Sequence, residues 1–379
     1  MLVYDTDKTG STWAPTTVLA EFENPKNIGY ATYLNDIGEA FWSVNQHDVK
    51  VDLRDEVGTA HVVILRNNEV VWRGLLAEHD ANQDDVVFYA YGYEHLLHKL
   101  YTPWNKRWKN QEIAGAAGRP VNDLWTRALA RTDSPVAWIS TGTLQSPFTS
   151  DAQDVVIVLN DYRVNFKRTL TCFKELVALA VSDTDNVVYM EIDYPTDPTD
   201  LSATFNFWRD RSADNTQFKL EYPNGNVLSF QDRYAPVTTH NRTLGVGSGP
   251  KRQIYRFNLT AWSGSPYSRN EFGMREEPLH LTWIRDRKEL KRIVRRRLKK
   301  AQRGDVDMFV RMFPDSIPPW RSVEGTHKLG DRIYVDIDDG ITAIAQWMWF
   351  MGEQTIFVGG REYVQPIMEA TSAFSEVDG

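Results

Sequence analysis

The chain has 379 residues, of which 42% are hydrophobic, and a formal net charge of −8 at pH 7. Its length exceeds that of one ordinary core and indicates two or three domains, and its apolar content excludes wholesale disorder. The negative charge argues against a protein that coats nucleic acid with its whole surface.

Three further features narrow the class of protein. The single cysteine, Cys172, excludes an intramolecular disulfide and indicates folding in a reducing compartment such as a cytoplasm. The first residues, MLVYDTDKTGSTWAP, lack the basic start and apolar core of a signal peptide, and no run of about 18 apolar residues predicts a membrane-spanning helix. Aromatic residues make up 12% of the chain, including 13 tryptophans, which favours a protein with large interfaces.

Residues 1–100 are predicted to form a first, small β-barrel domain. The strand candidates are rich in β-branched and aromatic residues and are separated by clusters of Asn, Gly and Asp. Short strands at this spacing are typical of a small barrel or sandwich. The candidates cover 17–22, 29–34, 39–44, 60–67, 69–79 and 85–93.

Residues 101–217 are predicted to form an inserted α+β domain. Apolar residues at helical spacing predict helices over 120–132 and 169–183, and a proline fits the start of the first. Strands are predicted over 187–194 and 203–210. Between them lies PTDPTDLS, whose prolines favour a loop.

β-Rich sequence resumes after the insert and predicts a second barrel that is split into two segments, 218–265 and 322–372. The intervening residues 266–321 are predicted to be a helical insert, with a helix over 286–302. The closing segment has strand candidates around an Asp-Asp-Gly turn at 338–340. The sequence therefore predicts an α+β protein that is mainly β.

Two parts of the sequence, 60–93 and 331–369, share one pattern. In each, a β-rich strand meets a tight polar turn, a strand with tryptophan follows, and another turn leads to a last strand. The tryptophans are Trp72 in the first part and Trp347 and Trp349 in the second. The pattern fits a distant duplication of one barrel, and it fits equally well two unrelated hairpins.

Motifs for catalysis and metal binding are mostly absent from the sequence, which has no G-x-S-x-G elbow, Walker loop or H-E-x-x-H. GVGSGP at 245–250 lacks the residues that complete a phosphate loop and is interpreted as a connection between strands. His95 and His98 have the spacing of a helical ligand pair, but no further ligands complete a metal site. We therefore predict no enzyme activity, no cofactor and no metal.

One segment is strongly basic. RDRKELKRIVRRRLKKAQR at 285–303 has 11 lysines and arginines, and its apolar residues recur at helical spacing, so one face packs down and the rest is basic. Three interpretations stay open: a solvated helix, a docking surface for an acidic protein, and binding to DNA phosphates. The basic residues that would dock a partner are Lys291, Arg292, Arg295, Arg296, Arg297 and Lys299.

Four stretches, taken in order, resemble the hub proteins of bacteriophage tail tips and baseplates, which are minor tail proteins. They are FWSVNQHD at 41–48, VVILRNNEVVWRGLLAEH at 62–79, GNVLSFQDRY at 225–234 and HKLGDRIYVDIDDG at 327–340. The likeness spans nearly the whole chain and rests on order and spacing more than on identity. In that family two similar β-barrels, the second split in sequence, form the tube part of a ring.

The resemblance implies structural roles for five residues in the barrels. Trp72 and Gly74 belong to a hairpin, Gly330 and Asp331 begin a strand, and Gly340 lies in a turn. Gly74 and Gly330 are expected where a barrel bends or where two backbones approach closely.

The resemblance also implies a structural virion protein, a homotrimeric hub at the tail tip whose six similar barrels match a six-fold tail tube. The implied partners are copies of itself and the distal tail, tail tube, tape-measure and tip or fibre proteins, with DNA as a transient passenger during ejection. It would be assembled in the host cytoplasm. Two other classes stay open: a carbohydrate-binding receptor-recognition tail protein, and a cell-wall-degrading tail enzyme with an unidentified carboxylate pair.

Overall fold

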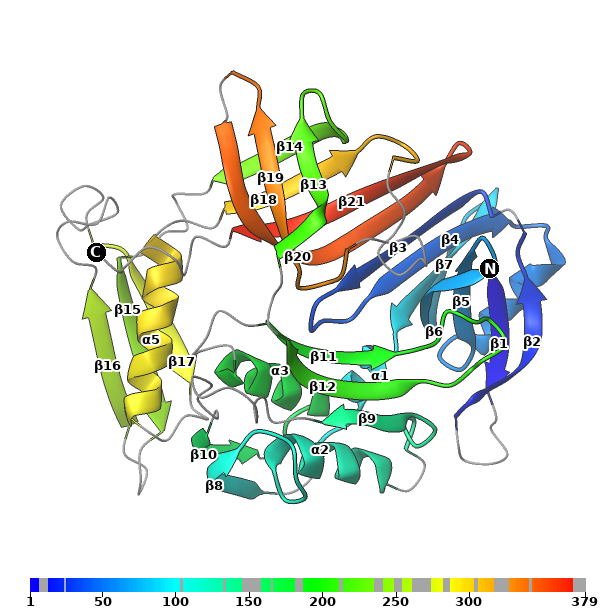
Figure 1. Ribbon diagram of the computed structural model, residues 1–379. Coiled ribbons are helices and arrows are strands. Elements are labelled where there is room, and N and C mark those ends of the chain that lie inside the picture. Colours follow the sequence, from blue (N-terminus) through cyan, green and yellow to red (C-terminus); the bar gives the residue numbers. More distant parts are fainter. Residues whose placement is uncertain are drawn as a thin grey trace.

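The structure is a computed structural model in which strands predominate over a few short helices, as predicted. Its largest sheet has 13 strands (Figure 1). The structure describes residues 1–6, 13–23, 25–102, 105–131, 134–144, 158–164, 166–180, 187–210, 214–234, 241–248, 254–260, 274–281, 287–302, 306–316, 327–340 and 343–370.

The amino-terminal part of the chain forms the first strand run of this sheet. Its strands pair antiparallel in the order β3-β4-β7-β6-β5-β1-β2. Along β7 every second residue, including Val86, Phe88 and Ala90, is buried, because alternate side chains of a strand face opposite sides. The strands are β1 (Leu2–Thr6), β2 (Pro15–Glu21), β3 (Asn27–Tyr33), β4 (Glu39–Asn45), β5 (His61–Arg66), β6 (Glu69–Ala81) and β7 (Asp85–Gly92), with a 3-10 helix η1 (Val49–Glu56) between β4 and β5.

The carboxy-terminal part of the chain forms the second strand run, in the order β14-β18-β21-β20-β19-β13. All neighbours in this run are antiparallel except β13 and β19, which are parallel. The strands are β13 (Asp214–Tyr222), β14 (Val227–Tyr234), β18 (Val306–Met312), β19 (Arg332–Asp338), β20 (Ala343–Val358) and β21 (Arg361–Ala370).

The long middle strands of the two runs, β6 and β20, have the same irregularity. β6 pairs with β5 as far as Leu75 and bulges against β7 at Ala77. β20 pairs with β19 as far as Trp349 and bulges against β21 at Met351. In both strands the bulge therefore comes two residues after the last residue that pairs with the preceding strand. The two segments that share a sequence pattern thus also share strand order and bulge position.

One strand pairing joins the two runs into a single sheet. Residues Gly352–Phe357, beyond the bulge in β20, pair antiparallel with Ile28–Tyr33 of β3. Pairing among the described residues closes neither run into a separate barrel, although two closed barrels were expected. In the first run, the edge of β3 that closure would need is paired with the second half of β20, whose first half pairs with β19.

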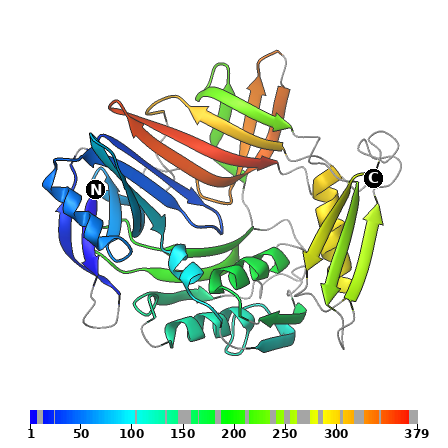
Figure 2. The same ribbon diagram turned by 180° about the vertical axis from the view of Figure 1, so that it is seen from behind.

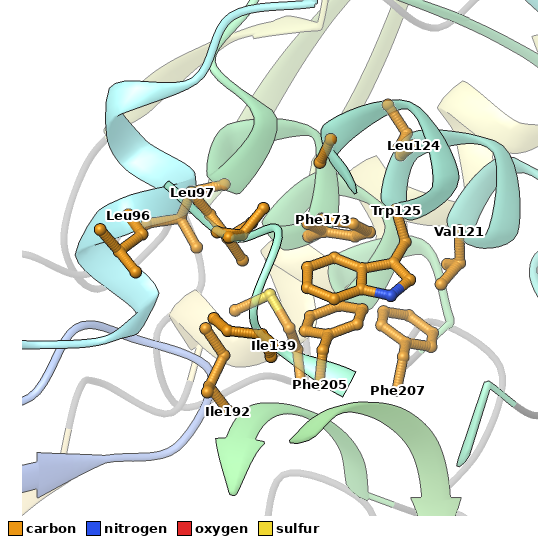
Figure 3. Close-up of a cluster of buried hydrophobic side chains, with 14 of the residues drawn as sticks. Leu96, Leu97, Val121, Leu124, Trp125, Ile139, Phe173, Ile192, Phe205 and Phe207 are labelled. Carbon is orange, nitrogen blue, oxygen red and sulfur yellow. The ribbon is translucent and has the colours of Figure 1, made fainter. Parts of the chain in front are cut away.

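The middle of the chain forms a smaller α/β layer beside the sheet (Figures 1 and 2). Its core is aromatic: the Trp125 and Phe205 rings stack with centroids 4.2 Å apart, and Phe173 lies 5.0 Å from Phe205 (Figure 3). The two helices predicted here are confirmed as α2 and α3. The elements are α1 (Glu94–Lys99), β8 (Lys106–Glu112), α2 (Pro120–Leu129), β9 (Ser140–Leu144), β10 (Val158–Val164), α3 (Thr169–Ala180), β11 (Val187–Asp193) and β12 (Thr204–Asp210).

The predicted basic helix is confirmed as α5 (Arg287–Gln302). It lies on a three-stranded sheet of order β16-β15-β17, made of β15 (Arg242–Ser248), β16 (Ile254–Thr260) and β17 (Glu276–Leu281). Figures 1 and 2 show this unit on the opposite side of the molecule from β1 and β2. A Cβ at Gly245 would stand 2.2 Å from Cγ2 of Val294, so the glycine permits close packing of α5 on β15.

The strand boundaries of this region differ from the sequence expectation. The GVGSGP segment begins inside β15 and is not only a connection. The sequence placed 218–265 in the second barrel, but β15 and β16 lie in the sheet under α5. It placed 266–321 in the helical insert, but β18 is the second strand of the large sheet's second run. Local patterns identify the strands but do not specify which distant strand each one joins.

Candidate functional site at the junction of the strand runs

The first hairpin has a glycine two residues after its tryptophan for a steric reason. Trp72 is buried in β6, and its Nε1 donates a hydrogen bond to the carbonyl oxygen of Ala31, 3.3 Å away in β3. A Cβ at Gly74 would stand 2.3 Å from Cη2 of Trp72 and 2.3 Å from the backbone oxygen of Tyr91. The indole ring and the neighbouring strand therefore fill the space that a side chain at position 74 would need.

Arg73, between these two residues, binds the middle layer. Its side chain is only 2% exposed. The guanidinium donates hydrogen bonds to the carbonyl oxygens of Asp197 at 3.1 Å, Asp200 at 2.8 Å and Ser202 at 3.3 Å. It also lies 5.5 Å from the centroid of the Tyr194 ring. Arg73 thus attaches the whole loop between β11 and β12 to the first strand run.

Two turns inside that loop direct its carbonyl groups toward Arg73. The Asp197 carboxylate accepts hydrogen bonds from the backbone N–H and the hydroxyl of Thr199, at 2.8 and 2.7 Å. The Asp200 carboxylate accepts one from the backbone N–H of Ser202 at 3.0 Å. Hydrogen bonds from the side chain and backbone of Thr199 lower the pKa of the Asp197 carboxyl group, and those from the side chain and backbone of Ser202 lower the pKa of the Asp200 carboxyl group. Asx-turns of this kind explain the repeated Asp-x-Thr/Ser spacing in PTDPTDLS.

A buried histidine lies beside this attachment. His61 of β5 has its Nδ1 3.1 Å from the Tyr93 hydroxyl and its Nε2 3.0 Å from the carbonyl oxygen of Trp13. The rings of His61 and Tyr93 both pack edge-on against Trp138. Burial lowers the pKa of His61 to about 4. The histidine is therefore neutral at pH 7 and bridges the N-terminal segment, the sheet and the middle layer.

We expect His61 to make the protein less stable in acid. Because its folded-state pKa lies below the ordinary value of 6.5, its contribution is fully present above about pH 6.5 and is lost as the pH falls toward 4. A shift of this size corresponds to slightly more than about 3 kcal/mol. Urea unfolding of wild type and His61→Gln at successive pH values measures it.

The readout of this titration is the difference in slope between the two proteins. His95 also has its pKa lowered to about 4, by burial, and titrates in the same window in both proteins. We expect the wild type to lose stability more steeply than His61→Gln between pH 6.5 and 4. Parallel curves would contradict the role given to His61.

Tyr189 of β11 contacts the second strand run close to its junction with the first. Its hydroxyl donates a 2.7 Å hydrogen bond to the carbonyl oxygen of Leu329, and its ring packs with Trp349 of β20. Leu34, which follows β3, packs against this cluster, and its backbone N–H donates to the carbonyl oxygen of Met351 at 2.8 Å. This cluster holds the middle layer against the point where β3 meets β20.

Asn35 completes the contact from the turn after β3. It has a left-handed backbone with φ of 60°. Its side-chain amide donates to the carbonyl oxygen of Val188 at 2.7 Å and accepts from the backbone N–H of Met190 at 2.6 Å. An asparagine suits this position because it tolerates a left-handed backbone and offers both a donor and an acceptor.

Two contacts between polar side chains lie near the same junction. Arg66, at the end of β5, pairs with Glu362 of β21, with Nε and Oε2 3.0 Å apart. Burial raises the pKa of Glu362 more than Arg66 lowers it. His327 and Glu353 form a fully buried pair at 3.0 Å, and the His327 ring stacks on Phe218. The first pair is a direct link between the two runs.

The three predicted residues near the end of the chain lie in turns. Gly330 has a left-handed backbone with φ of 85°, and its N–H donates to the carbonyl oxygen of Phe350 at 2.8 Å. The Asp331 carboxylate accepts hydrogen bonds from the N–H of Lys328 at 2.9 Å and the amide of Asn215 at 3.0 Å. Gly340, with φ of 84°, follows β19. Gly330 and Asp331 thus hold the start of β19 against β20 and β13.

The basic residues of α5 are distributed around an apolar stripe. Leu290, Val294 and Leu298 are buried. Arg295 is exposed and Lys291 is half-buried. The side chains of Arg292, Arg296, Arg297 and Lys299 lie outside the described residues, although their helical backbone is described.

The residues considered for chemistry are packed into the fold. His95 and His98 stack on each other with centroids 5.7 Å apart, and His98 contacts Arg168 at 3.3 Å. Within the described ranges no group of three or more His, Cys, Asp or Glu side chains is arranged to hold a metal ion. Cys172 is buried, and burial raises the pKa of its thiol to about 12. A thiol of this kind is a poor nucleophile.

The junction depends on residues that the sequence alone did not single out. Arg73 had a recognisable signal, because an arginine inside the apolar strand VVWRGLL must be satisfied if the strand is buried on both faces. Tyr189 and Asn35 had no such signal, because their partners lie more than 100 residues away in the sequence.

The architecture of this chain is similar to that of proteins of known structure. No protein-family model matches the chain, and no curated protein matches it. Among solved structures, the 43 kDa tail protein of prophage MuSo2 from Shewanella oneidensis superposes with a TM-score of 0.60 and 10% identity, covering 99% of this chain and 100% of that one. The tail protein from Neisseria meningitidis MC58 superposes with a TM-score of 0.57 and 9% identity, covering 92% and 93%.

The chain has the fold of these phage tail proteins. The E. coli c3393 protein, a type VI secretion component described as similar to T4 tail proteins gp27 and gp5, matches with a TM-score of 0.50 and 10% identity over 93% of this chain and 74% of that one. The resemblance expected from the sequence is therefore confirmed at the level of the fold. Within the described residues of this tail-protein fold, no helix is long and apolar enough to cross a membrane.

Proposed function

We propose that the protein is a structural subunit of a phage tail, a homotrimeric hub at the tail tip. The observation that carries the proposal is the pair of strand runs with the same order and the same bulge, in a chain with the tail-protein fold. Three copies would supply six similar runs around one axis, which suits contact with a six-fold tail tube. The two runs would be the two tube domains, and the described residues used above serve packing and assembly.

The proposed hub joins several tail components. It would lie between the tail tube and distal tail proteins on one side and tip or fibre proteins on the other. Its channel would enclose the end of the tape-measure protein and later pass DNA. The net charge of −8 suits a channel along which DNA slides without binding.

Negative-stain electron microscopy of the purified protein at high concentration tests the proposal. Rings with three lobes and a central hole are the expected result. Solid particles of one subunit would count against a hub and in favour of a monomeric binding protein. Binding to cell-wall polysaccharide would then be the next measurement.

The basic helix provides a second test, because α5 presents basic residues away from its buried stripe. We expect reversal of charge at Arg295, Arg296 and Arg297 to leave folding unchanged and to weaken assembly with an acidic partner. Buried Leu290 and Val294 would keep the helix in place. Thermal unfolding and assembly into infectious tails are the two measurements.

The matched control changes the same net charge at exposed positions elsewhere: Lys99→Glu, Lys109→Glu and Lys219→Glu. If the helix docks a partner, the control assembles better than the helix variant. An equal loss of assembly in both variants would indicate a general effect of charge. Normal assembly of tails from the helix variant would show that α5 is a solvated helix that docks no partner.

A further inference from the structure

β6 ends in a strand segment that has one edge without a partner among the described strands. The short segment between η1 and β5 covers this edge at Leu76, whose N–H donates to the carbonyl oxygen of Ala60 and whose carbonyl oxygen accepts from the N–H of Gly58. Beyond that point, no described strand pairs with the same edge of residues 77–81, although their other edge pairs with β7. Glu78 and Asp80 are exposed there.

The equivalent segment of β20 is covered. After its bulge, Gly352–Phe357 pairs with β21 on one edge and with β3 on the other. The same run order and the same bulge make β3 of the first run the counterpart of β14 in the second. The β3–β20 pairing is therefore an example, within one chain, of how two such runs associate.

β14 offers the partner that the β6 segment lacks. As far as the structure describes the chain, β14 pairs only with β18 and leaves its second edge without a strand. Leu228, Ser229 and Gln231 on this strand are exposed. An unpaired edge strand with exposed apolar residues is prone to pair with another chain.

We propose that β14 of one copy of this chain pairs antiparallel with residues 77–81 of β6 in the next copy, repeating between chains the β3–β20 pairing found within the chain. This contact is head-to-tail, so it uses two different surfaces and propagates around a ring. It rests on the proposed hub function and names the surfaces through which the hub assembles.

The sheet itself specifies the register of this pairing. Corresponding residues of the two runs are identified by following the strand pairings across each run, starting from the residue before the bulge. The first run gives Leu76, Ala90, Ala40 and Tyr30, and the second gives Phe350, Met368, Met308 and Asp232. Tyr30 and Asp232 therefore occupy the same place in their strands.

This register predicts one pair of opposite charges. Ala31, next to Tyr30, pairs with Gln354, which is three residues beyond the bulge of β20. The matching residues between copies are Arg233 in β14 and Asp80, three residues beyond the bulge of β6. Residues of opposite charge placed directly across two strands favour pairing, and like charges oppose it.

A charge-swap experiment tests the contact. The assembly state of the full chain is measured by sedimentation velocity over a range of concentrations for wild type, Asp80→Arg, Arg233→Asp and the double variant. Each single variant is expected to raise the concentration needed for assembly about tenfold. The double variant is expected to return it to within about twofold of wild type. Asp336→Arg, exposed on fully paired β19, is the control and should assemble like wild type.

The outcomes separate this contact from the hub function. Trimers that form equally well in all variants overturn the contact and leave the hub standing. Loss of assembly in both single variants without rescue in the swap overturns the register. Rescue in an assembly that is not a trimer supports the contact and overturns the trimeric hub. A wild-type protein that stays monomeric up to its solubility limit overturns both.

Discussion

Replacing Arg73 by methionine is expected to lower the free energy of unfolding by about 4 kcal/mol. Methionine keeps most of the apolar stem but removes every hydrogen bond to Asp197, Asp200 and Ser202. Those carbonyl groups would then face an apolar side chain, and the loop between β11 and β12 would lose its attachment to β6. Charge-assisted hydrogen bonds in a buried site are among the strongest single contacts in a protein.

Urea unfolding at pH 7 measures the loss. Arg295→Met, at an exposed position of α5, makes the same chemical change and should alter stability by less than about 0.5 kcal/mol. Arg73→Lys should fall between the two, because one ammonium cannot reproduce the spread of a guanidinium over three carbonyl oxygens. An Arg73→Met protein as stable as wild type would show that the loop is held by its other contacts, such as the hydrogen bond from the N–H of Val70 to the carbonyl oxygen of Thr196.

Replacing Gly74 by alanine is expected to cost about 3 kcal/mol or slightly more. The added Cβ would meet the backbone oxygen of Tyr91 and the Trp72 ring, each at 2.3 Å. The ring is buried and its Nε1 is bound to Ala31, so it cannot rotate away without losing that hydrogen bond. Strand β7 would have to move instead, and the β6–β7 pairing would weaken.

Gly340→Ala is the control for this substitution. Gly340 has φ of 84° and nothing within 4 Å of its virtual Cβ, so alanine there should cost about 1 kcal/mol for the left-handed backbone alone. Thermal and urea unfolding of both variants give the difference, which is the cost of the steric contact at position 74. Equal losses at the two positions would mean that the sheet adjusts around the extra methyl group.

Local sequence patterns determined much of the secondary structure. Proline at the first turn and apolar residues at helical spacing predicted α2, and an apolar stripe in a basic segment predicted α5. β-Branched and aromatic residues between turn residues predicted β7, and a repeated strand-turn-strand pattern predicted the two meanders that contain β6 and β20. These features depend on residues within one or two turns of each other, so periodicity and turn residues are enough to specify them.

Only the tertiary structure decided how these elements associate. The sequence does not show that β20 pairs with β3, that β15 and β16 leave the large sheet, or that the apolar stripe of α5 packs on β15. The same holds for Arg73 and Tyr189, whose partners are distant in the chain. The residue pattern of a strand shows which of its faces is apolar, but it does not show which other strand will pair with it. Backbone hydrogen bonds are chemically alike in every strand, so the choice of partner strand depends on the packing of the whole molecule.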